Sequence, residues 1–508
     1  MKKILQILLL LVFNISFVVA QNDSLNIYQQ DFIYLTQLLE DTHPNIYENI
    51  DKEELEKCKK ITLQKLQSID KNVDFQIYAQ KYVSKLKDAH TKIFFGQMTN
   101  DFKYPLQIYY VKNKIFISNL DKTLPKDWLG AEILSFNNIP IDTVINRASE
   151  YFSCENRYCY LENIVKALND YQFLKLIEVI SDNKILQLKV KQLNSKIETI
   201  EFTQLSKNKF KQLPENKLTG FSNNLFHYKI LNDKNTCYFH YQECRDLQYL
   251  KANKKRYKPM YFVYYVAWWI RGGNFSKFLK KMFHDVEKDN IQNLVIDVRQ
   301  NRGGSSILNE QLLEYITSSS KVKDYSESVK LSNLLKQRHP KYFNDIYTEY
   351  REKHLLDTIK LPFLIKENDK IFTNSSNECR NEYLTSLQSP YYMQEPKYKF
   401  TGNIYILTSP KTFSSAAMLA IKLRDNNIAV TVGMPTGQKP TQFGEALWFT
   451  LPLTHTRGIV SCKKFYRPDR SKDKELSLYP DIELWYNIKD IIYGTDTVFD
   501  KLFDEIIK

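Results

Sequence analysis

The 508-residue sequence is poor in glycine, with 13 residues in the whole chain. That is about 3% of the chain, against a usual share of about 7%. Together with 16 prolines, this excludes collagen-like, mucin-like and flexible-linker architectures. In so glycine-poor a chain, neighbouring glycines indicate positions where the backbone requires them. The pairs are Gly272–Gly273 and Gly303–Gly304.

Beyond the N-terminus, the chain has no apolar run of the ~18 residues that a membrane-spanning helix needs. Hydrophobic residues make up 43%, charged residues 26%, and the mean hydropathy is -0.45. This composition predicts a folded chain with a large core, rather than a disordered or membrane-embedded one. We therefore expect no stable membrane insertion.

The first twenty residues have the three-part pattern of a secretory signal peptide. Lys2 and Lys3 precede an apolar run over residues 4–19, and Val18-Val19-Ala20 forms a cleavage site before Gln21. No cysteine follows that site, which argues against a lipoprotein anchor. The sequence therefore predicts a signal peptide at 1–20 and export of the mature protein to the periplasm or beyond.

Charge and cysteine content exclude further classes. The formal net charge of +14 falls to +12 without the two signal lysines, and the basic residues are scattered, which predicts a solvated surface and no nucleic-acid partner. The chain has neither a CxxC nor an HExxH motif, so we predict no metal site and no cofactor. An odd number of cysteines, seven, leaves at least one unpaired. Cys154 and Cys159 could close a short loop, whereas Cys237 and Cys244 point to opposite faces of a predicted strand.

Hydrophobic periodicity predicts a mixed α/β, multidomain chain. Helical spacing of apolar residues predicts a helical N-terminal region, and short strand-like runs with a helical insertion follow. Later strand-helix-strand units predict an α/β core. The run Met260–Ile270 predicts a buried helix or lid, with a membrane-surface patch as the alternative. The predicted regions are 21–100 (helical), 101–205 (β-rich), 225–490 (α/β core) and 491–508 (C-terminal helix).

Two segments of the core carry candidate chemistry. The first, DVRQNRGG at 297–304, follows a buried strand and precedes a helix. Its glycines would let backbone N–H groups approach a ligand oxygen, as in an oxyanion hole. A tight turn would explain the glycines but not the whole Asp/Arg/Asn/Gly/Gly spacing.

The second segment, TFSSAA at 412–417, lies where a strand ends and a helix begins. Ser414 would there be held in the positive field of the helix N-terminus, although a plain helix cap explains it equally well. Lys439 follows after one helix and one strand, so it can return to the same edge of the sheet. A serine and a partly buried lysine can form a Ser-Lys dyad.

These segments resemble one family when read together with LKDAHT (86–91), the PDZ-like segment 129–141, VGMPTGQKP (432–440), FTLPLT (449–454) and YPDIE (479–483). They are similar, in the same order, to the tail-specific or C-terminal processing serine proteases. The resemblance implies a PDZ-like domain over 101–205 and a catalytic core that cleaves peptides or proteins near their C-termini with a Ser-Lys dyad.

By this resemblance Ser414 is the nucleophile and Lys439 the general base, with Asp425 at a family acidic position. Gly303 or Gly304 would form the oxyanion hole together with the Ser415 amide.

The chain also departs from the family pattern. Residues 414–417 read Ser-Ser-Ala-Ala where the family has Ser-Ala-Ser-Glu, and the supporting glutamine position holds Phe443, with Gln442 one place before it. His90 in LKDAHT is a competing base of the kind used by tricorn-type relatives, or else a structural histidine. The sequence favours a divergent serine peptidase, with a non-catalytic peptide-binding protein or a hydrolase of another acyl bond as alternatives.

Overall fold

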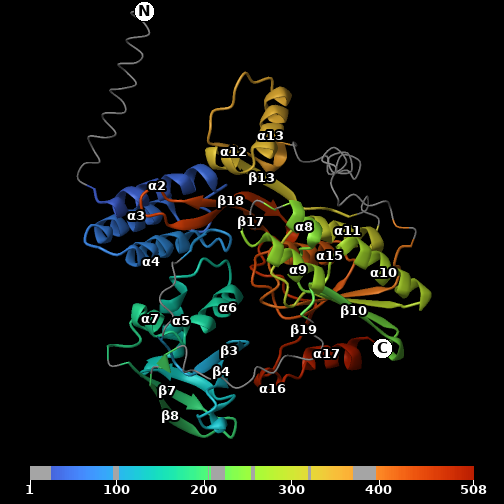
Figure 1. The fold of residues 1–508 in the computed structure, drawn as a ribbon, viewed down its shortest axis with the longest axis horizontal. Helices are drawn as coiled ribbons and strands as arrows, with labels where there is room; N and C mark the ends of the chain where they lie inside the picture. Colours follow the sequence, from blue (N-terminus) through green and yellow to red (C-terminus); the bar gives the residue numbers. More distant parts are fainter. Residues whose placement is uncertain are drawn as a thin grey trace, which may run out of the picture. The chain divides into compact units, whose positions relative to one another are not determined.

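The computed structural model describes residues 25–94, 102–182, 184–203, 205–206, 223–252, 254, 258–317, 322–369, 396 and 398–507. The predicted signal peptide lies outside these residues. The chain is a mixture of helices and several sheets, as predicted. It divides into two compact units, and each unit is assembled from segments that are distant in the sequence (Figure 1).

The first unit combines residues 1–98, 329–365 and 445–463. Its helices are α2 (Ile27–Thr42), α3 (Lys52–Leu66), α4 (Asn72–Val83), α12 (Asn333–Arg338) and α13 (Pro340–Lys353). They accompany a sheet of order β1-β18-β13-β14, in which β17 also pairs with β18. The predicted N-terminal helices are present, and they share this unit with two segments from within the predicted catalytic region. The strands are β1 (Lys92–Ile93), β13 (Ser326–Leu331), β14 (Phe363–Ile365), β17 (Gln442–Thr450) and β18 (Arg457–Tyr466).

The second unit contains the predicted β-rich region. Its six-stranded sheet has the order β3-β4-β5-β7-β8, with β6 beside β5, and all pairs are antiparallel. Strand β7 alternates buried and exposed residues, the pattern of a sheet with one solvated face. The PDZ-like character of this region stays a prediction. Its strands are β3 (Leu106–Val111), β4 (Lys114–Leu120), β5 (Glu132–Phe136), β6 (Ile139–Pro140), β7 (Ile185–Lys191) and β8 (Ile197–Thr203), and its helices are α5 (Ile141–Ser149), α6 (Arg157–Ala167) and α7 (Tyr171–Leu176).

The same unit contains the α/β core, a six-stranded sheet of order β10-β11-β12-β15-β16-β19. All neighbouring pairs are parallel except β10 with β11. The sheet is buried on both faces, as continuous apolar strands require. In β12, Leu294 and Ile296 face a core formed with α10, α11 and α15, whereas Val295 faces Leu502 and Phe503. The elements are β10 (Phe226–Leu231), β11 (Thr236–Tyr241), β12 (Asn293–Asp297), β15 (Asn403–Thr408), β16 (Val430–Gly433), β19 (Ile482–Glu483), α10 (Phe275–Lys288), α11 (Ser306–Ile316) and α15 (Ser415–Asp425).

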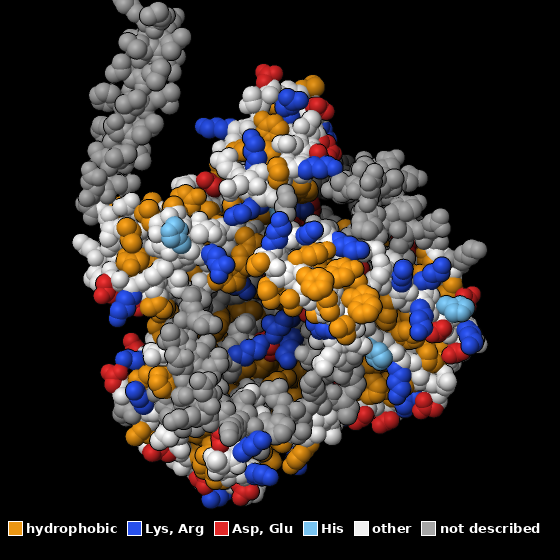
Figure 2. Space-filling view, in the orientation of Figure 1, with side chains coloured by type: hydrophobic (Ala, Val, Ile, Leu, Met, Phe, Trp, Pro, Cys, Tyr) orange, Lys and Arg blue, Asp and Glu red, His pale blue; other side chains and the backbone are white. Residues whose placement is uncertain are grey.

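The prediction that the helix at 260–270 is buried is wrong. Helix α9 (Tyr261–Arg271) forms, but of its residues Trp268 is buried, while Phe262 is 74% and Trp269 66% exposed. Figure 2 shows hydrophobic side chains gathered in the region where Figure 1 draws α8 (Leu247–Ala252) and α9. The apolar sequence therefore forms a surface feature rather than part of the core.

The C-terminus differs in detail from the single helix predicted at 491–508. A short helix α16 (Ile488–Tyr493) ends at Gly494, which has a φ of 74°. Helix α17 (Thr497–Lys501) then continues into π-helical residues Leu502–Ile506. Within the described residues, no helix is long and apolar enough to cross a membrane.

Candidate active site

Two loops meet at the carboxyl edge of the parallel sheet. One follows β12 and carries DVRQNRGG, and the other follows the neighbouring strand β15 and leads into α15. The hydroxyl of Thr412 donates to the carbonyl of Val298 at 2.9 Å, and the N–H of Phe413 donates to the carbonyl of Asn301 at 3.1 Å. The carboxyl ends of parallel strands are where α/β folds bind ligands. The two segments singled out from the sequence therefore lie side by side.

Ser414 occupies a strained turn between β15 and α15. Its φ of 54° and ψ of -129° lie in a region that residues with a side chain rarely adopt. Helix α15 begins at the next residue, so its N-terminal field acts on the half-buried Ser414. No side-chain capping bond forms at this N-cap, so the plain cap interpretation of Ser414 is not supported. A serine on a strained strand-to-helix turn is the arrangement of a nucleophile elbow.

Gly303 packs directly against this turn. Its φ is 88°, and a Cβ added there would lie 2.7 Å from both the Phe413 carbonyl oxygen and the Ser414 Cβ. Gly304, with a φ of 146°, approaches the carbonyl of Cys244 in the same way. The Gly303 N–H donates to Asn301 Oδ1 at 2.8 Å, and the hydroxyl of Ser415 donates to the Gly304 carbonyl at 3.0 Å. The structure thus brings Gly303, Gly304 and Ser415 to Ser414.

Gln438 is a site residue that the sequence analysis missed. Its fully buried side chain accepts a hydrogen bond from the backbone N–H of Ser414. A Cβ on Gly437 would lie 2.3 Å from the carbonyl oxygen of Pro410, so this segment packs tightly on the Ser414 loop. The sequence signal that could have identified Gln438 is its position in TGQKP, directly before Lys439.

Lys439 is half-buried beside Gln438. Its backbone N–H donates to Glu155 Oε2 at 2.8 Å, while its ammonium makes no hydrogen bond or ion pair to any residue that the structure describes. The structure therefore brings the Lys439 segment to Ser414 without recording a bond between the two side chains.

A disulfide loop contacts the segment that carries Lys439. Cys154 and Cys159 are bridged, as the sequence allowed, while Cys237 and Cys244 are free. Within the loop, Asn156 Nδ2 donates to the carbonyls of Thr436 at 3.1 Å and Leu476 at 2.8 Å. The covalent loop therefore holds the backbone that carries Lys439.

Asp425 is not brought to Ser414. It ends α15, eleven residues away, or about 16 Å at the rise of a helix. There it forms a buried ion pair with Arg467, whose Nη2 lies 2.6 Å from Asp425 Oδ1. Gln442 begins β17 and is buried, and its Oε1 has no partner within the described residues. Asp425 is thus placed as a structural residue, and the supporting role of Gln442 stays a prediction.

The Asp297-x-Arg299 part of the first motif is structural. Arg299 is fully buried and pairs with Asp297 at 2.6 Å and with Asp496 at 2.8 Å. Burial opposes the charge of Asp297, but the guanidinium of Arg299 keeps the pKa of its carboxyl below the ordinary value. This network fixes the start of the loop whose end carries Gly303 and Gly304.

His90 belongs to the first unit, where a buried carboxylate orders its backbone. Its N–H donates to Asp88 Oδ1 at 2.9 Å. Asp88 also lies 3.3 Å from His43 Nε2 and accepts a bond of 2.7 Å from Ser461 Oγ. Burial raises the pKa of Asp88, but the hydrogen bond and charge of His43 outweigh it and lower that pKa to about 2. LKDAHT therefore builds a rigid turn around Asp88.

Among the described residues, no group of three or more His, Cys, Asp or Glu side chains could hold a metal ion. The chemistry available at the described site is that of a serine hydroxyl and backbone amides, with the Lys439 segment beside them.

Comparisons with known proteins find a family match over part of the chain and structures with a similar fold. A model of peptidase family S41 matches residues 265–484, while a search of curated proteins gives no match. The structure of mature CPAF superposes with a TM-score of 0.61 at 14% identity, covering 95% of this chain and 96% of CPAF. Mature CPAF complexed with lactacystin gives a TM-score of 0.59 at 14% identity, covering 95% and 97%. Residues 265–484 thus match peptidase family S41, a family of serine-type peptidases, and the chain shares its fold with mature CPAF.

Proposed function

We propose that the chain is an exported serine peptidase in which Ser414 attacks peptide bonds near the C-termini of its substrates. The observation that carries this proposal is the strained backbone of Ser414, held at the N-terminus of α15 with Gly303 packed on it. Such strain persists where the surroundings impose it, and it is characteristic of functional sites.

The chemistry follows from these groups. Ser414 Oγ bonds to the carbonyl carbon of the scissile peptide as its proton passes to a base. In this proposal the Ser415 amide donates to the resulting oxyanion, together with an amide of the Gly303–Gly304 pair. Because the Gly303 N–H already donates to Asn301, the Gly304 amide is the better candidate. The base then protonates the leaving amine, the C–N bond breaks, and water releases the acyl group by the reverse sequence.

We assign Lys439 as that base, with His90 as the alternative. Lys439 follows Gln438, whose side chain contacts the Ser414 amide. No described carboxylate forms an ion pair with the Lys439 ammonium. An ion pair would hold the lysine in its charged form, which cannot accept a proton.

Substituting each base in turn tests the assignment. With Lys439 as the base, Lys439→Ala and Lys439→Arg both lose peptidase activity, because a guanidinium stays protonated at any working pH. His90→Ala then keeps most of the activity. The opposite pattern, with Lys439→Ala active and His90→Ala inactive, would move the assignment to His90.

Recognition of substrate tails is assigned to the β-rich region. Strand β3 lies at the edge of its sheet, where a peptide can add as a further strand and have its terminal carboxylate bound by backbone amides. We expect slower cleavage of a peptide whose C-terminus is amidated than of the same peptide with a free C-terminus. Equal cleavage rates for the two peptides would show that the enzyme does not recognise the substrate C-terminus, without contradicting its peptidase activity.

Export is supported by the disulfide between Cys154 and Cys159, because such bonds persist in oxidising compartments. The mature protein is expected to start at or near Gln21. An intact-mass measurement on exported protein that still finds Met1 would contradict this.

A further inference from the structure

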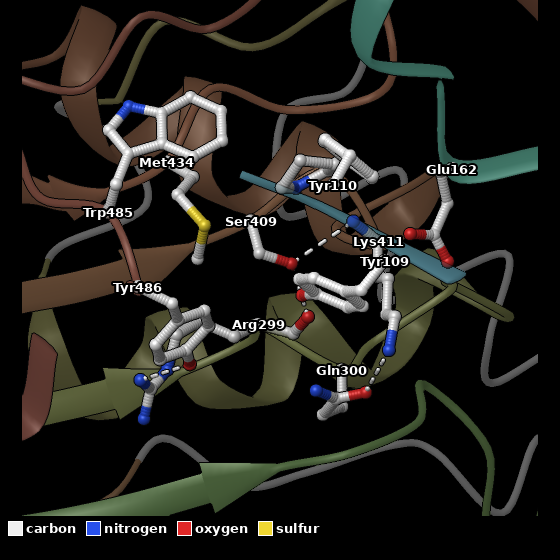
Figure 3. A pocket seen from close by; sticks show the side chains of 11 residues that line it. Tyr109, Tyr110, Glu162, Arg299, Gln300, Ser409, Lys411, Met434, Trp485 and Tyr486 are labelled. Atoms are coloured by element: carbon white, nitrogen blue, oxygen red, sulfur yellow. Dashed lines mark hydrogen bonds between the residues drawn. The ribbon is translucent and has the colours of Figure 1, made fainter. Parts of the chain in front are cut away.

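A cluster of cations surrounds one carboxylate beside the Ser414 loop. Helix α6 contributes Glu162 and Lys166, the loop after β12 contributes Arg302, and the loop after β15 contributes Lys411. Glu162 Oε1 lies 2.5 Å from Lys166 Nζ and 3.0 Å from Arg302 Nη2. Lys411 Nζ donates to Gln300 Oε1 at 3.4 Å, and in Figure 3 its side chain lies on the same side of the pocket as Glu162.

The cluster carries more positive charge than its own carboxylate neutralises. Glu162 has 9% of its side chain exposed, whereas Lys166 and Arg302 have 50% and 59% exposed. The carboxylate thus lies beneath the cations and holds two of them in place. Burial lowers the pKa of Lys166, and the charges of Arg302 and Lys411 lower it further, against the opposing effect of Glu162. Three cations crowded around one buried anion favour binding a second anion.

Its position relates the cluster to the reaction. Arg302 directly precedes Gly303, and Lys411 lies three residues before Ser414, a span of at most about 11 Å along the chain. Lys411 and Glu162 line a small pocket together with aromatic and apolar side chains, namely Tyr109, Tyr110, Met434, Trp485 and Tyr486 (Figure 3). Two of the three cations are therefore close along the chain to the residues that form the Ser414 turn.

We propose that Lys166, Arg302 and Lys411 form a subsite for a carboxylate of the substrate, close to the scissile bond. The carboxylate is either an Asp or Glu side chain or the C-terminal carboxylate itself, since both offer the same bidentate acceptor. Glu162 positions Lys166 and Arg302 for this contact. The inference rests on the proposed peptidase function and adds the charge preference of its site.

The test uses one peptide sequence in four forms, with Asp or Asn near the scissile bond and a free or amidated C-terminus. For the unmodified enzyme we expect kcat/KM to fall about tenfold when the recognised carboxylate is neutralised, because a charge-assisted hydrogen bond is lost. A fall on Asp→Asn assigns a side-chain carboxylate to the subsite, and a fall on amidation that Lys411→Gln or Arg302→Gln reduces assigns the C-terminal one; a fall on amidation that neither variant changes belongs to the β-rich region. Lys411→Gln and Arg302→Gln should each shrink the preference ratio, whatever they do to absolute activity.

Lys280→Gln, a change at an exposed lysine on α10, is the matched control and should leave the ratio unchanged. A binding measurement with Ser414→Ala makes the test independent of turnover: fluorescence anisotropy should show weaker binding of the neutral peptides than of the acidic ones. Equal kcat/KM and equal binding for all four forms would overturn the subsite while leaving the peptidase function intact. Absence of any cleavage, together with selective binding of acidic peptides, would instead contradict the proposed function and retain the subsite.

Discussion

Among single residues, Ser414 is distinguished by its unfavourable backbone conformation. Ser414 has a φ of 54°, and the neighbouring Gly303 leaves no room for a side chain of its own. The two features fit together, since a glycine is needed for the loop after β12 to reach the serine turn. Substitutions at either residue should therefore change the stability of the fold as well as the activity.

Replacing Ser414 with glycine should stabilise the protein relative to replacing it with alanine. Glycine relieves strain of about 1–3 kcal/mol, against a chain-entropy cost of roughly 0.5–1 kcal/mol. We expect Ser414→Gly to have a free energy of unfolding about 1 kcal/mol above that of Ser414→Ala, with both variants inactive. Denaturant titration of the two proteins measures the difference, and a less stable glycine variant would contradict the strain.

Gly303→Ala should damage both stability and activity. The new Cβ would meet the Phe413 carbonyl oxygen and the Ser414 Cβ at 2.7 Å, so the Ser414 loop has to shift. The control is Gly273→Ala, which also has a positive φ, of 71°, but whose Cβ would lie 4.0 Å from its nearest atom. We expect Gly303→Ala to lose about 1–3 kcal/mol more than the control, together with nearly all kcat. Equal losses of stability and activity in the two variants would show that Gly303 does not need its close approach to the Ser414 turn.

The sequence allowed part of this site to be predicted. Ser414 and the Gly303–Gly304 pair stood out because motif spacing and scarce glycines are visible along the chain. Gln438 did not, because its role is one side-chain bond to a distant backbone N–H. Asp425 was matched to a family position, although its actual partner, Arg467, lies 42 residues further along the chain.

At the scale of elements, the turn after α4 is organised by the buried Asp88. Three segments contribute its neighbours: His43 follows α2, Thr91 precedes β1, and Ser461 lies in β18. Since the folded-state pKa of Asp88, about 2, is below its ordinary value of 3.8, the ionised form stabilises the fold. That stabilisation is fully present above the ordinary value and is lost as the pH falls towards 2.

Asp88→Asn should therefore lower the free energy of unfolding by about 2 kcal/mol at pH 7, and the difference from the unmodified protein should shrink between roughly pH 4 and pH 2. Denaturant titrations across that range measure it. Asp51→Asn, at an exposed residue of the same unit, is the control and should parallel the unmodified protein. A difference that stays constant down to pH 2 would contradict the low pKa of Asp88.

The disulfide loop makes a second prediction at this scale. Opening it in the double variant Cys154→Ser and Cys159→Ser should cost about 2 kcal/mol of stability, as expected for a short closed loop. Because the loop holds the backbone carrying Lys439, kcat/KM should also fall roughly ten- to a hundredfold. Cys58→Ser, at a free cysteine, is the control for kinetics and stability. Unchanged kinetics in the double variant would show that the loop does not position the site.

Elements were predictable where burial follows directly from the sequence. The parallel strands of the core read as continuous apolar runs because both faces are covered. Helix α9 was misjudged for the same reason, since an apolar run does not reveal whether another element covers it. Its exposed aromatic residues are the clearest case where tertiary context decides the outcome.

At the scale of the whole molecule, sequence order conceals how the chain is assembled. The first unit joins the N-terminal helices with residues 329–365 and 445–463, and the second joins the β-rich region to the α/β core. Sequence periodicity finds the elements but not such pairings, because the contacts join segments hundreds of residues apart. In the second unit, DVRQNRGG and Gln438 both meet the turn at Ser414.

Labelling with a fluorophosphonate tests whether Ser414 is the nucleophile. An activated Ser414 Oγ would bond to phosphorus and release fluoride, so peptide mapping of the labelled protein by mass spectrometry should find the adduct at Ser414. Peptidase activity should fall in proportion to labelling, and the denatured chain should stay unlabelled. Full peptidase activity in a protein completely labelled at Ser414, or in Ser414→Ala, would show that Ser414 is not the nucleophile.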